Sequence, residues 1–458
     1  MQDGREYIGI KEIVGPLIIL EKTHNIGYNE FVEVEDKNGQ ILSGVVLDTS
    51  KEAVVVQVFE GTMGLDIKRT KARFKNKPLM IPVTKEMTGR IFSGTGKPLD
   101  RAPYPVSREY RNVNGDPVNP TARTYPRKFI QTGVSSIDGM NTLIRGQKLP
   151  IFSGSGLVHN KLAAQITRQA QIVGERSDFA IVFVAMGVKN DVAHYFIKNF
   201  EDSGVLQNVT MFLSLASDPS IERLITPRCA LTFAEFLAFN LGYHVLVIMT
   251  DMSNYCEALR EISTIRGEIP GRKGYPGYLY SDLASLYERS GMLKDSKGSI
   301  TQLPILTMPN DDISHPVPDL TGYITEGQIV LERDLHNRGI YPPVAGLPSL
   351  SRLMKDSIGK DLTREDHPHL ASQLFASYAR VKDVRALASV IGEEELTPLD
   401  HQYLKFGESF EREFLSQDEY ENRSIEQTLD MGWKVLAHLP QEELNRLTEE
   451  EILKYFAG

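Results

Sequence analysis

Gly154-Ser155-Gly156-Leu157-Val158-His159-Asn160-Lys161 lies between an apolar, strand-sized run (Leu149 to Phe152) and a helix-like segment (Lys161 to Val173). A glycine-rich turn from a strand into a helix is where a phosphate-binding loop is found, because the backbone N–H groups at a helix N-terminus attract anions. The placement of the turn therefore fits an α/β core of the nucleotide-binding type. On these eight residues alone, however, an ordinary Gly-rich strand-to-helix turn is the favoured interpretation.

The same stretch departs from a working phosphate-binding loop, which reads Gly, four residues, Gly, Lys, then Ser or Thr. Its second Gly lets the N–H groups close on phosphate, its Lys reaches the β and γ oxygens, and its hydroxyl holds Mg²⁺. Counted from Gly154, those last three places are held by His159, Asn160 and Lys161. If Lys161 is the phosphate Lys, Ser155 replaces the first Gly, Asn160 the second and Leu162 the hydroxyl. Neither register is complete, so we expect a degenerate loop, no cofactor bound by this chain alone and no metal site.

Two further positions bear on whether this chain can hydrolyse a nucleotide. The apolar run His244 to Thr250 ends at Asp251, and an Asp there holds the Mg²⁺ shell in phosphate-loop enzymes. Without a loop hydroxyl as partner, we expect Asp251 to cap a helix that starts near Asn254. After the run Phe179 to Met186, Gly187 is followed by Val188, which cannot orient an attacking water; Asp191 is expected to cap the next helix.

The residues around the loop predict a parallel sheet. The apolar runs Val209 to Leu215 and Ile300 to Met308 join those already named, and helix-like segments such as Val192 to Phe200 separate most of them. Strands that are apolar on both faces and alternate with helices indicate a parallel sheet covered on both sides, with ligands bound beyond the carboxyl ends of its strands.

The chain before this core predicts an N-terminal antiparallel β-barrel over residues 1–75. Short strand-like runs separated by turn residues are typical of such barrels. The predicted strands are Ile8 to Ile10, Leu17 to Leu20, Phe31 to Val34, Ile41 to Leu47 and Ala53 to Phe59. Residues 89–127 are rich in Gly and Pro and read as an irregular connector at the start of the core, which we assign to residues 76–348.

Strand signals stop near Ser349, and residues 349–458 predict an α-helical domain. Ser424 followed by Gln427 is a capping box, and Thr397-Pro398 and Leu439-Pro440 place Pro in a first helical turn. Apolar residues follow at helical spacing: Leu374, Tyr378 and Val381, then Leu429, Trp433 and Leu436. The acidic runs Glu393 to Glu395 and Glu449 to Glu451 are expected to be solvated faces.

Composition limits the class of protein. The 458 residues are 41% hydrophobic with a net charge of −9, and no apolar run is long enough to span a bilayer. The N-terminus lacks the basic-then-apolar pattern of a signal peptide, and the acidic balance argues against a general nucleic-acid binder. The two cysteines, Cys229 and Cys256, suggest a reducing cytoplasm without a disulfide framework. His367 and His369 flank Pro368 and are expected to be an exposed loop pair rather than metal ligands.

Four longer segments carry a family resemblance: Asp251 to Ile262, Pro270 to Tyr278, Pro304 to Asp312 and Asp319 to Gln328. Over nearly its whole length the chain strongly resembles the B subunit of V-type (archaeal and vacuolar type) rotary ATPases. The resemblance implies a barrel, a RecA-like core and a helical domain. It also implies a non-catalytic role, with three copies alternating with three catalytic A subunits in a ring around a central shaft subunit.

The resemblance also implies a role for Arg352, in the stretch Leu347-Pro-Ser-Leu-Ser-Arg352-Leu-Met. It matches the arginine finger that reaches in trans into the A subunit's site, where Mg-ATP or ADP binds at the interface. The residues alone favour a salt bridge within a loop, and it is the resemblance that favours the arginine finger. Peripheral stalk subunits would bind through the barrel region, and the membrane sector would be coupled indirectly. Expected localisation is therefore cytoplasmic, peripheral to the membrane, without nucleic acid.

Two departures from the family's pattern affect these expectations. Pro342-Pro343-Val344 leads to Ala345-Gly346 where an acidic or amide residue is usual, which would loosen the loop before Arg352. Gly267 follows Arg266 where a second Arg is common, so any contact made by that side chain is absent. Roles for Arg260 and Arg266 stay open. The turn from Gly271 to Gly277 is either a plain Gly/Pro turn or, as the family suggests, a segment near the shaft.

Two other functions would use parts of the same architecture. An autonomous hexameric NTPase of the export or translocase type would use the same core, but it requires an intact loop Lys and a catalytic carboxylate. An RNA-binding ring helicase would share the barrel and core, but the chain is acidic and its barrel lacks aromatic-plus-basic strand signatures. The sequence does not specify H⁺ or Na⁺ as the transported ion, or whether the complex runs as a pump or a synthase.

Overall fold

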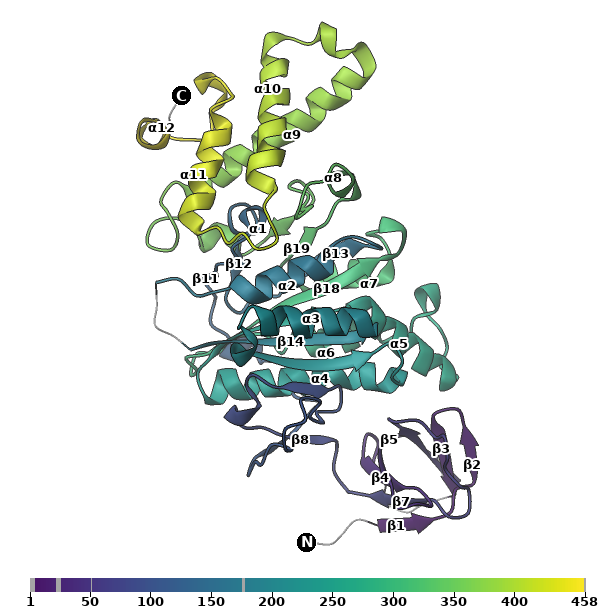
Figure 1. Cartoon of the computed structure of the whole chain (residues 1–458). Coiled ribbons are helices and arrows are strands. Elements are labelled where there is room, and N and C mark those ends of the chain that lie inside the picture. Colours follow the sequence, from purple (N-terminus) through teal and green to yellow (C-terminus); the bar gives the residue numbers. More distant parts are fainter. Residues whose placement is uncertain (1–4, 22–25, 51, 175–177, 457–458) are drawn as a thin grey trace.

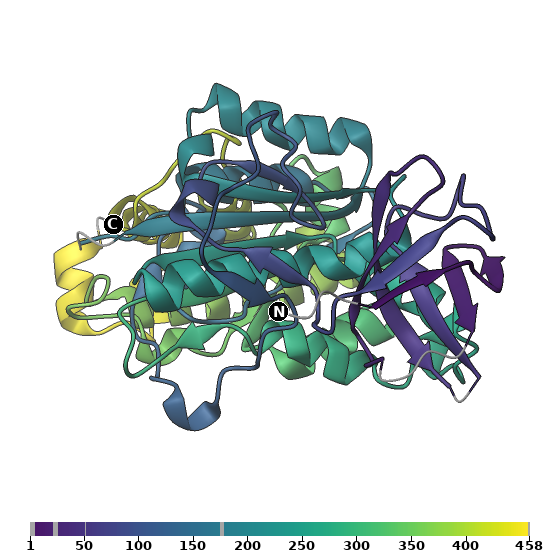
Figure 2. The same ribbon diagram turned by 90° about the horizontal axis from the view of Figure 1, so that it is seen from below.

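A computed structural model describes residues 5–21, 26–50, 52–174 and 178–456. Three regions follow one another along the long direction of the molecule (Figure 1). A small β-structure lies at the N-terminal end, a layered α/β core in the middle and a helical region at the C-terminal end. Seen from the N-terminal end, the purple strands lie to one side of the core (Figure 2). No helix among the described residues is long and apolar enough to cross a membrane.

The N-terminal region is a seven-stranded antiparallel sheet that curls back on itself. Its strands are β1 (Arg5–Ile8), β2 (Glu12–Val14), β3 (Leu17–Glu21), β4 (Phe31–Glu35), β5 (Ile41–Thr49), β6 (Ala53–Val58) and β7 (Lys71–Phe74). Their order is β1-β7-β4-β5-β6-β3-β2. The two edge strands, β1 and β2, are consecutive in the chain and only residues 9–11 join them, so the sheet must bend until its edges are neighbours. The predicted antiparallel barrel is confirmed, although the sequence reading missed β2 and β7 and placed β1 too late.

The core is built on a nine-stranded sheet. Its main path is β20-β19-β13-β18-β16-β14-β15-β9, and β17 pairs with β18 at one side. The strands are β9 (Ile91–Ser93), β13 (Ile151–Gly154), β14 (Phe179–Val188), β15 (Val209–Leu215), β16 (His244–Thr250), β17 (Gly291–Met292), β18 (Ser299–Met308), β19 (Gly327–Val330) and β20 (Leu350–Ser351). All pairs are parallel except β17 with β18 and β20 with β19. The predicted parallel sheet is confirmed, but the expected irregular connector contributes β9 to its edge.

Short strand pairs and helices complete the core. The pairs are β8 (Met80–Pro82) with β10 (Tyr110–Asn112), and β11 (Phe129–Ile130) with β12 (Leu143–Ile144). The helices are α1 (Ser135–Asp138), α2 (His159–Gln169), α3 (Asn190–Asp202), α4 (Ser220–Glu235), α5 (Met252–Ile265), α6 (Leu279–Tyr287), α7 (Pro316–Ile324) and α8 (Arg333–Asn337).

Helices cover both faces of the sheet, as the alternation of strand side chains requires. In β14, Phe183 and its alternate neighbours pack with α2 and α3, whereas Val182 and Val184 pack with α4 and α5. Both faces of the strand are therefore buried, which explains its unbroken apolar sequence.

The C-terminal region is a helical bundle. It comprises α9 (His367–Ile391), α10 (Pro398–Ser409) continued by the π-helical turn η9 (Phe410–Leu415), α11 (Ile425–Leu436) and α12 (Glu449–Tyr455). The apolar residues predicted at helical spacing are all buried in one cluster. The Ser424–Gln427 capping box and Pro398 at the start of α10 are confirmed. Pro440 instead precedes a short 3-10 turn.

Two expectations for this region were wrong. His367 and His369 lie in the first turn of α9 rather than in a loop. His367 is buried, with Nδ1 3.0 Å from Thr363 Oγ1 and Nε2 3.0 Å from the Gly139 carbonyl. His369 pairs with Glu451, which is buried at the start of α12, so the run Glu449 to Glu451 is not wholly a solvated face.

Burial of His367 makes the bundle acid-sensitive. Loss of solvation lowers the pKa of His367 from its ordinary value of 6.5 to about 4. Between these values the unfolded chain binds the proton and the folded chain does not, so stability present above pH 6.5 is lost as the pH falls towards 4.

We expect the His367→Gln variant to lose this component, on the order of 3 kcal/mol, because Gln can donate to the Gly139 carbonyl without titrating. The measurement is the urea midpoint from pH 7 to pH 4, followed by fluorescence of Trp433, the single tryptophan of the chain, which lies in the same bundle. Asp138 is buried and its pKa is raised to about 7, so its contribution to stability changes with pH in the opposite direction. The pH dependence of the variant's midpoint is therefore compared with that of the parent. An equal change of the midpoint with pH in the two proteins would refute the role given to His367.

A buried arginine joins the connector to the core. Arg289 is fully buried, donates to both carboxylate oxygens of Glu235 at 2.6 and 2.8 Å, and donates to the Val113 carbonyl at 3.0 Å. Gly115 lies against its guanidinium, since a Cβ there would be 2.4 Å from Cζ.

The Arg289→Ala variant should lose about 3–5 kcal/mol of stability, because Glu235 would keep its charge in a poorly solvated place without its partner. Urea unfolding followed by far-ultraviolet circular dichroism measures the loss. Arg412→Ala, at an exposed position, is the control and should change stability by less than about 0.5 kcal/mol. Equal effects of the two variants would contradict the argument.

Candidate functional site

The glycine-rich stretch forms the turn between β13 and α2, at the carboxyl edge of the parallel sheet. Gly154 ends the strand, Gly156 adopts a φ of +81° that favours glycine, and α2 begins at His159. Ser155 and Gly156 are exposed. The loop therefore has the position of a nucleotide-binding loop, and its function depends on the side chains around it.

An ion pair from this chain packs on the first glycine of the loop. Arg333, at the start of α8, donates to both carboxylate oxygens of Asp311 at 2.7 and 2.8 Å. Its Nη2 also donates to the Ser155 carbonyl at 2.9 Å. A Cβ at Gly154 would lie 1.9 Å from the Asp311 carboxylate, so the pair touches the loop backbone. The hydrogen bond from Arg333 lowers the pKa of Asp311, so the carboxylate that packs on the loop is ionised.

Side chains at the end of the loop already make contacts with other residues of this chain. His159 Nδ1 lies 3.0 Å from Ser153 Oγ, and burial lowers the pKa of the imidazole, which leaves it neutral at pH 7. Lys161 is half exposed, and its Nζ lies 3.4 Å from the Glu419 carboxylate. Asn160 follows His159 in the first turn of α2. These residues do not fit a Mg-nucleotide, because no hydroxyl follows the loop and its cation is directed to the C-terminal region.

A cavity of about 700 Å³ opens beside Lys161. It is lined by Val158 and Lys161 of the loop and α2, by residues 339–341, and by residues 416–420 of the helical region. The helical region thus forms one wall of the space next to the degenerate loop.

The other NTPase positions have structural roles. Asp251 caps α5 by accepting from the Ser253 N–H at 2.7 Å, and it also accepts from the Thr307 hydroxyl at 2.5 Å. The predicted capping role is confirmed, with the helix starting at Met252 rather than near Asn254. Val188 is buried at the end of β14. Asp191 lies in the first turn of α3, but Lys189 holds the N-cap position, so the expected cap was wrong.

Arg352 directly follows β20 and is exposed. Its backbone N–H donates to the Glu326 carbonyl at 3.0 Å, and its Nη1 to the Thr325 carbonyl at 3.3 Å. Within the chain it therefore makes hydrogen bonds to backbone carbonyls, and the guanidinium is open to solvent.

Arg352 and the loop lie at opposite edges of the sheet. Strand β20 is antiparallel to β19, and Ser351 pairs with Gly327, the first residue of β19. Ile329, two residues after Gly327, pairs with Ile151 of β13. Ser351 is therefore level with residue 149 along the strands. Ser155 of the loop lies six residues further towards the carboxyl ends. At about 3.3 Å per residue this is roughly 20 Å, well beyond the length of an arginine side chain. The structure does not bring the two candidate sites of the sequence together.

The departures from the family pattern have local explanations. Ala345 is buried and donates its N–H to the Val330 carbonyl at 2.8 Å, and the looser loop expected from the missing acidic or amide residue stays a prediction. Gly267 has a φ of +69° and ends α5, a left-handed cap position that favours Gly.

The nearby residues whose roles the sequence leaves open make mostly local contacts. Arg260 pairs with Glu257, and Arg266 with Glu268. The turn from residue 271 to 277 is joined to α7 and the segment before it by Arg272–Asp319 and Lys273–Asp312 ion pairs. Proximity of this turn to a shaft stays a prediction.

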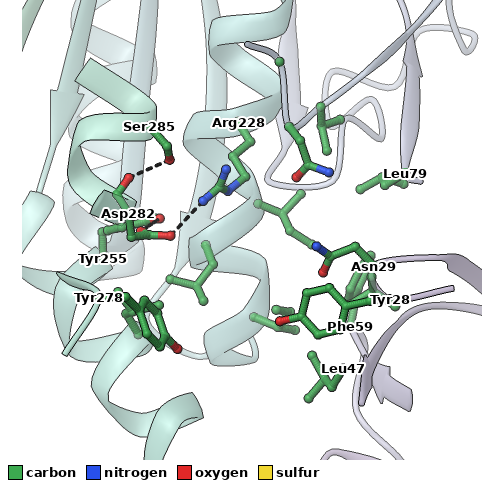
Figure 3. A pocket seen from close by; sticks show the side chains of 18 of the residues that line it. Tyr28, Asn29, Leu47, Phe59, Leu79, Arg228, Tyr255, Tyr278, Asp282 and Ser285 are labelled. Carbon is green, nitrogen blue, oxygen red and sulfur yellow. Dashed lines mark hydrogen bonds and ion pairs between the residues drawn. The ribbon is translucent and has the colours of Figure 1, made fainter. Parts of the chain in front are cut away.

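A second cavity, of about 580 Å³, lies where the barrel meets the core (Figure 3). Phe59 and Leu47 line it from the barrel side. Its buried polar groups pair with one another: Arg228 donates to Asp282 at 2.9 Å, and the Tyr255 hydroxyl donates to the same carboxylate. Burial raises the pKa of Tyr255, which keeps this hydroxyl a donor. The cavity is a feature of the domain junction and lies apart from the loop.

The sequence singled out the loop and Arg352 as candidates, but it gave no sign of the pair that packs on the loop. Asp311 lies in one of the segments that carry the resemblance, yet no spacing links it to Arg333, 22 residues later. Only the proximity of the ends of β13, β18 and β19 brings them together.

Comparisons with known proteins agree with this architecture. Residues 10–75 match the "ATP synthase alpha/beta family, beta-barrel domain", residues 133–351 the "nucleotide-binding domain" of the same family, and residues 356–456 the "C-terminal domain of V and A type ATP synthase". A solved structure described as a unique ATP synthase subunit NeqB from Nanoarcheaum equitans is similar, with a TM-score of 0.74 and 43% identity over 93% of this chain and all of that one.

Two full-length relatives are closer in sequence. A V-type ATP synthase beta chain from Halothermothrix orenii is 61% identical over 99% of this chain and 98% of its own length. V-type ATP synthase beta chain 2 from Treponema pallidum is 60% identical over 99% of this chain and 94% of its own length. With the degenerate loop at one edge of its sheet and all three regions matched, the chain belongs to the V-type ATP synthase beta (B) chain family.

Proposed function

We propose that this chain is a non-catalytic ring subunit that completes the ATP site of a neighbouring catalytic A subunit. The observation that carries the proposal is the placement of Arg352 at the edge of the sheet opposite the chain's own loop. A solvent-open guanidinium that cannot reach its own loop is suited to a site on another subunit. The Asp311–Arg333 pair on the loop argues against phosphate binding by this chain itself.

Arg352 would act as an arginine finger in trans. A guanidinium brought across an interface neutralises charge that develops on the γ-phosphoryl oxygens, an effect of about 10³–10⁵ in rate in related phosphoryl transfers. Its planar fork can donate two parallel hydrogen bonds to the phosphoryl group, which a lysine cannot do. The nucleotide is the substrate of the neighbour, and no step of the reaction uses the loop at residues 154–161.

The assembly proposed for this chain follows from its family. Three copies would alternate with three A subunits around a central shaft subunit, with Mg-ATP or ADP at the interface. Peripheral stalk subunits would bind near the barrel, and the membrane sector that carries H⁺ or Na⁺ would be coupled through them and the shaft. The chain would therefore work in the cytoplasm at the membrane periphery, coupling ATP hydrolysis or synthesis to rotation.

The isolated chain should not turn over ATP. With millimolar Mg-ATP and no A subunit, we expect phosphate release at background level, unchanged in Asn160→Ala and Lys161→Ala, because neither side chain would contact a phosphate. A coupled phosphate assay measures this. Sustained turnover that either substitution abolishes would instead indicate an autonomous NTPase.

The Arg352→Ala variant should assemble into the ring with A subunits and lose about 10³-fold or more in kcat. Arg352→Lys should recover little of the loss, since the charge remains but the fork is absent. Steady-state ATPase assays on rings whose composition is checked by native mass spectrometry measure the effect. The Arg412→Ala ring is the control, because Arg412 is an exposed arginine of the helical region. Near-parental activity of the Arg352→Ala ring would refute the finger assignment.

A further inference from the structure

We propose that Gln147 is a positioning residue for Arg352, acting through Ser351 and Glu326. The inference rests on the proposed arginine-finger function and deepens it. It concerns a buried amide that no sequence pattern marks.

Arg352 depends on residues 325–327 for its place. Its N–H donates to the Glu326 carbonyl at 3.0 Å, and its Nη1 to the Thr325 carbonyl at 3.3 Å. Only two residues precede it in β20, so the strand itself is too short to fix the turn. Whatever fixes residue 326 and Ser351 therefore fixes the start of the Arg352 side chain.

Gln147 bridges those two residues. It is fully buried, and its Nε2 donates to the Glu326 carbonyl at 3.1 Å and to Ser351 Oγ at 2.9 Å. Its Oε1 accepts from the Ile144 N–H at 2.9 Å, and Ser351 Oγ in turn donates to the Thr142 carbonyl at 2.9 Å. Both N–H donors of the amide are thus used. One binds Glu326, the residue just before β19, and the other binds Ser351 in β20.

Glu326 is held from its other side by Lys148. The Lys148 N–H donates to Glu326 Oε2 at 2.8 Å, its buried Nζ lies 2.7 Å from Oε1, and the Glu326 N–H donates to the Lys148 carbonyl at 3.1 Å. Consecutive residues, 147 and 148, therefore fix the peptide that Arg352 binds. A displacement of either strand would break several hydrogen bonds among buried groups, which is costly.

The next residue leaves no room for the strands to shift towards one another. Gly327 has a φ of +133°, and a Cβ at this position would lie 2.0 Å from the Leu350 carbonyl oxygen. The two backbones are in direct contact at the residue pair that precedes Arg352. Gln147 on one side and this contact on the other define where the turn begins.

A catalytic guanidinium must be held to within about 0.5 Å, and a displacement of about 1 Å costs about 10²-fold in rate. Loss of the Gln147 bridge would let β20 move and would degrade transition-state stabilisation by Arg352. Because a finger interacts with the transition state more than with bound ATP, the loss should appear in kcat with KM for ATP unchanged.

The test compares two isosteric substitutions in rings assembled with the A subunit. Gln147→Met removes the bridge, and we expect kcat to fall about 10- to 100-fold at constant KM. Gln302→Met is the matched control: Gln302 is also fully buried, its backbone N–H bonds to the Gln147 carbonyl, and its side chain donates to the Leu286 carbonyl instead of the Arg352 turn. The control should keep kcat within about twofold of the parent.

A double-mutant cycle with Arg352→Ala separates positioning from a general structural effect. If Gln147 acts through Arg352, Gln147→Met should cause no further loss in a ring that already carries Arg352→Ala. An additive loss, equal losses for Gln147→Met and Gln302→Met, or an unchanged kcat for Gln147→Met would overturn the positioning role. The proposed function fails separately, if Arg352→Ala alone leaves kcat intact.

Ser351→Ala provides a second reading if the Gln147→Met ring does not assemble. It removes one hydrogen bond of the bridge and should give a smaller kcat loss that is likewise absent in the Arg352→Ala background. An unchanged kcat in this variant, or a loss that persists in that background, would overturn the proposal.

Discussion

The antiparallel pairing of two residues, Leu350 and Ser351, with the start of β19 determines at which end of the core strands Arg352 lies. Every other strand along the path of the core sheet is parallel, so the loops that follow these strands lie at the carboxyl edge, where α/β proteins bind ligands. The reversal at β20 returns the chain to the amino edge just before Arg352. A parallel strand here would have placed Arg352 at the edge occupied by the chain's own loop.

At the carboxyl edge, the chain's own side chains contact its nucleotide-loop backbone. Asp311 and Arg333 pack on Gly154, and Lys161 is directed to Glu419 in the helical region. The loop keeps the backbone course of a phosphate-binding turn, while an ionised carboxylate lies against it. This arrangement stabilises the strand-to-helix turn and joins it to neighbouring loops. It also explains how a chain of a nucleotide-binding family can retain the fold without the phosphate-binding side chains.

Patterns that are local in sequence predicted much of this structure. Strands β15 and β16 were predicted residue for residue, since buried parallel strands are short runs of mostly apolar residues. The capping box at Ser424 and the cap at Asp251 were also predictable, because a cap involves residues within a few positions of one another. The boundaries proposed between the three regions remain predictions.

Contacts between segments that lie far apart in the chain could not be predicted from the sequence. His367 was expected in a loop because a Pro follows it, yet Pro is also favoured in a first helical turn, and burial against Gly139 depends on the helical region docking on α1. Strand β7 is short and carries two basic residues, Lys71 and Arg73. Their side chains form ion pairs with an acidic residue of the neighbouring strand β4. The bridge made by Gln147 joins residues about 180 and 200 positions away, and no periodicity in the sequence records it.

In the proposed function, this chain contributes Arg352 to a neighbour's ATP site and contributes nothing to phosphate binding at its own loop. A structure of the assembled ring with ADP and an aluminium fluoride mimic of the transferred phosphoryl group tests both parts of this proposal. We expect the Arg352 guanidinium within hydrogen-bond distance of the fluoride group on the adjacent A subunit, with the Asp311–Arg333 pair still packed on the loop at residues 154–161. A guanidinium turned away from that group, or the mimic bound in this chain's own loop, would contradict it.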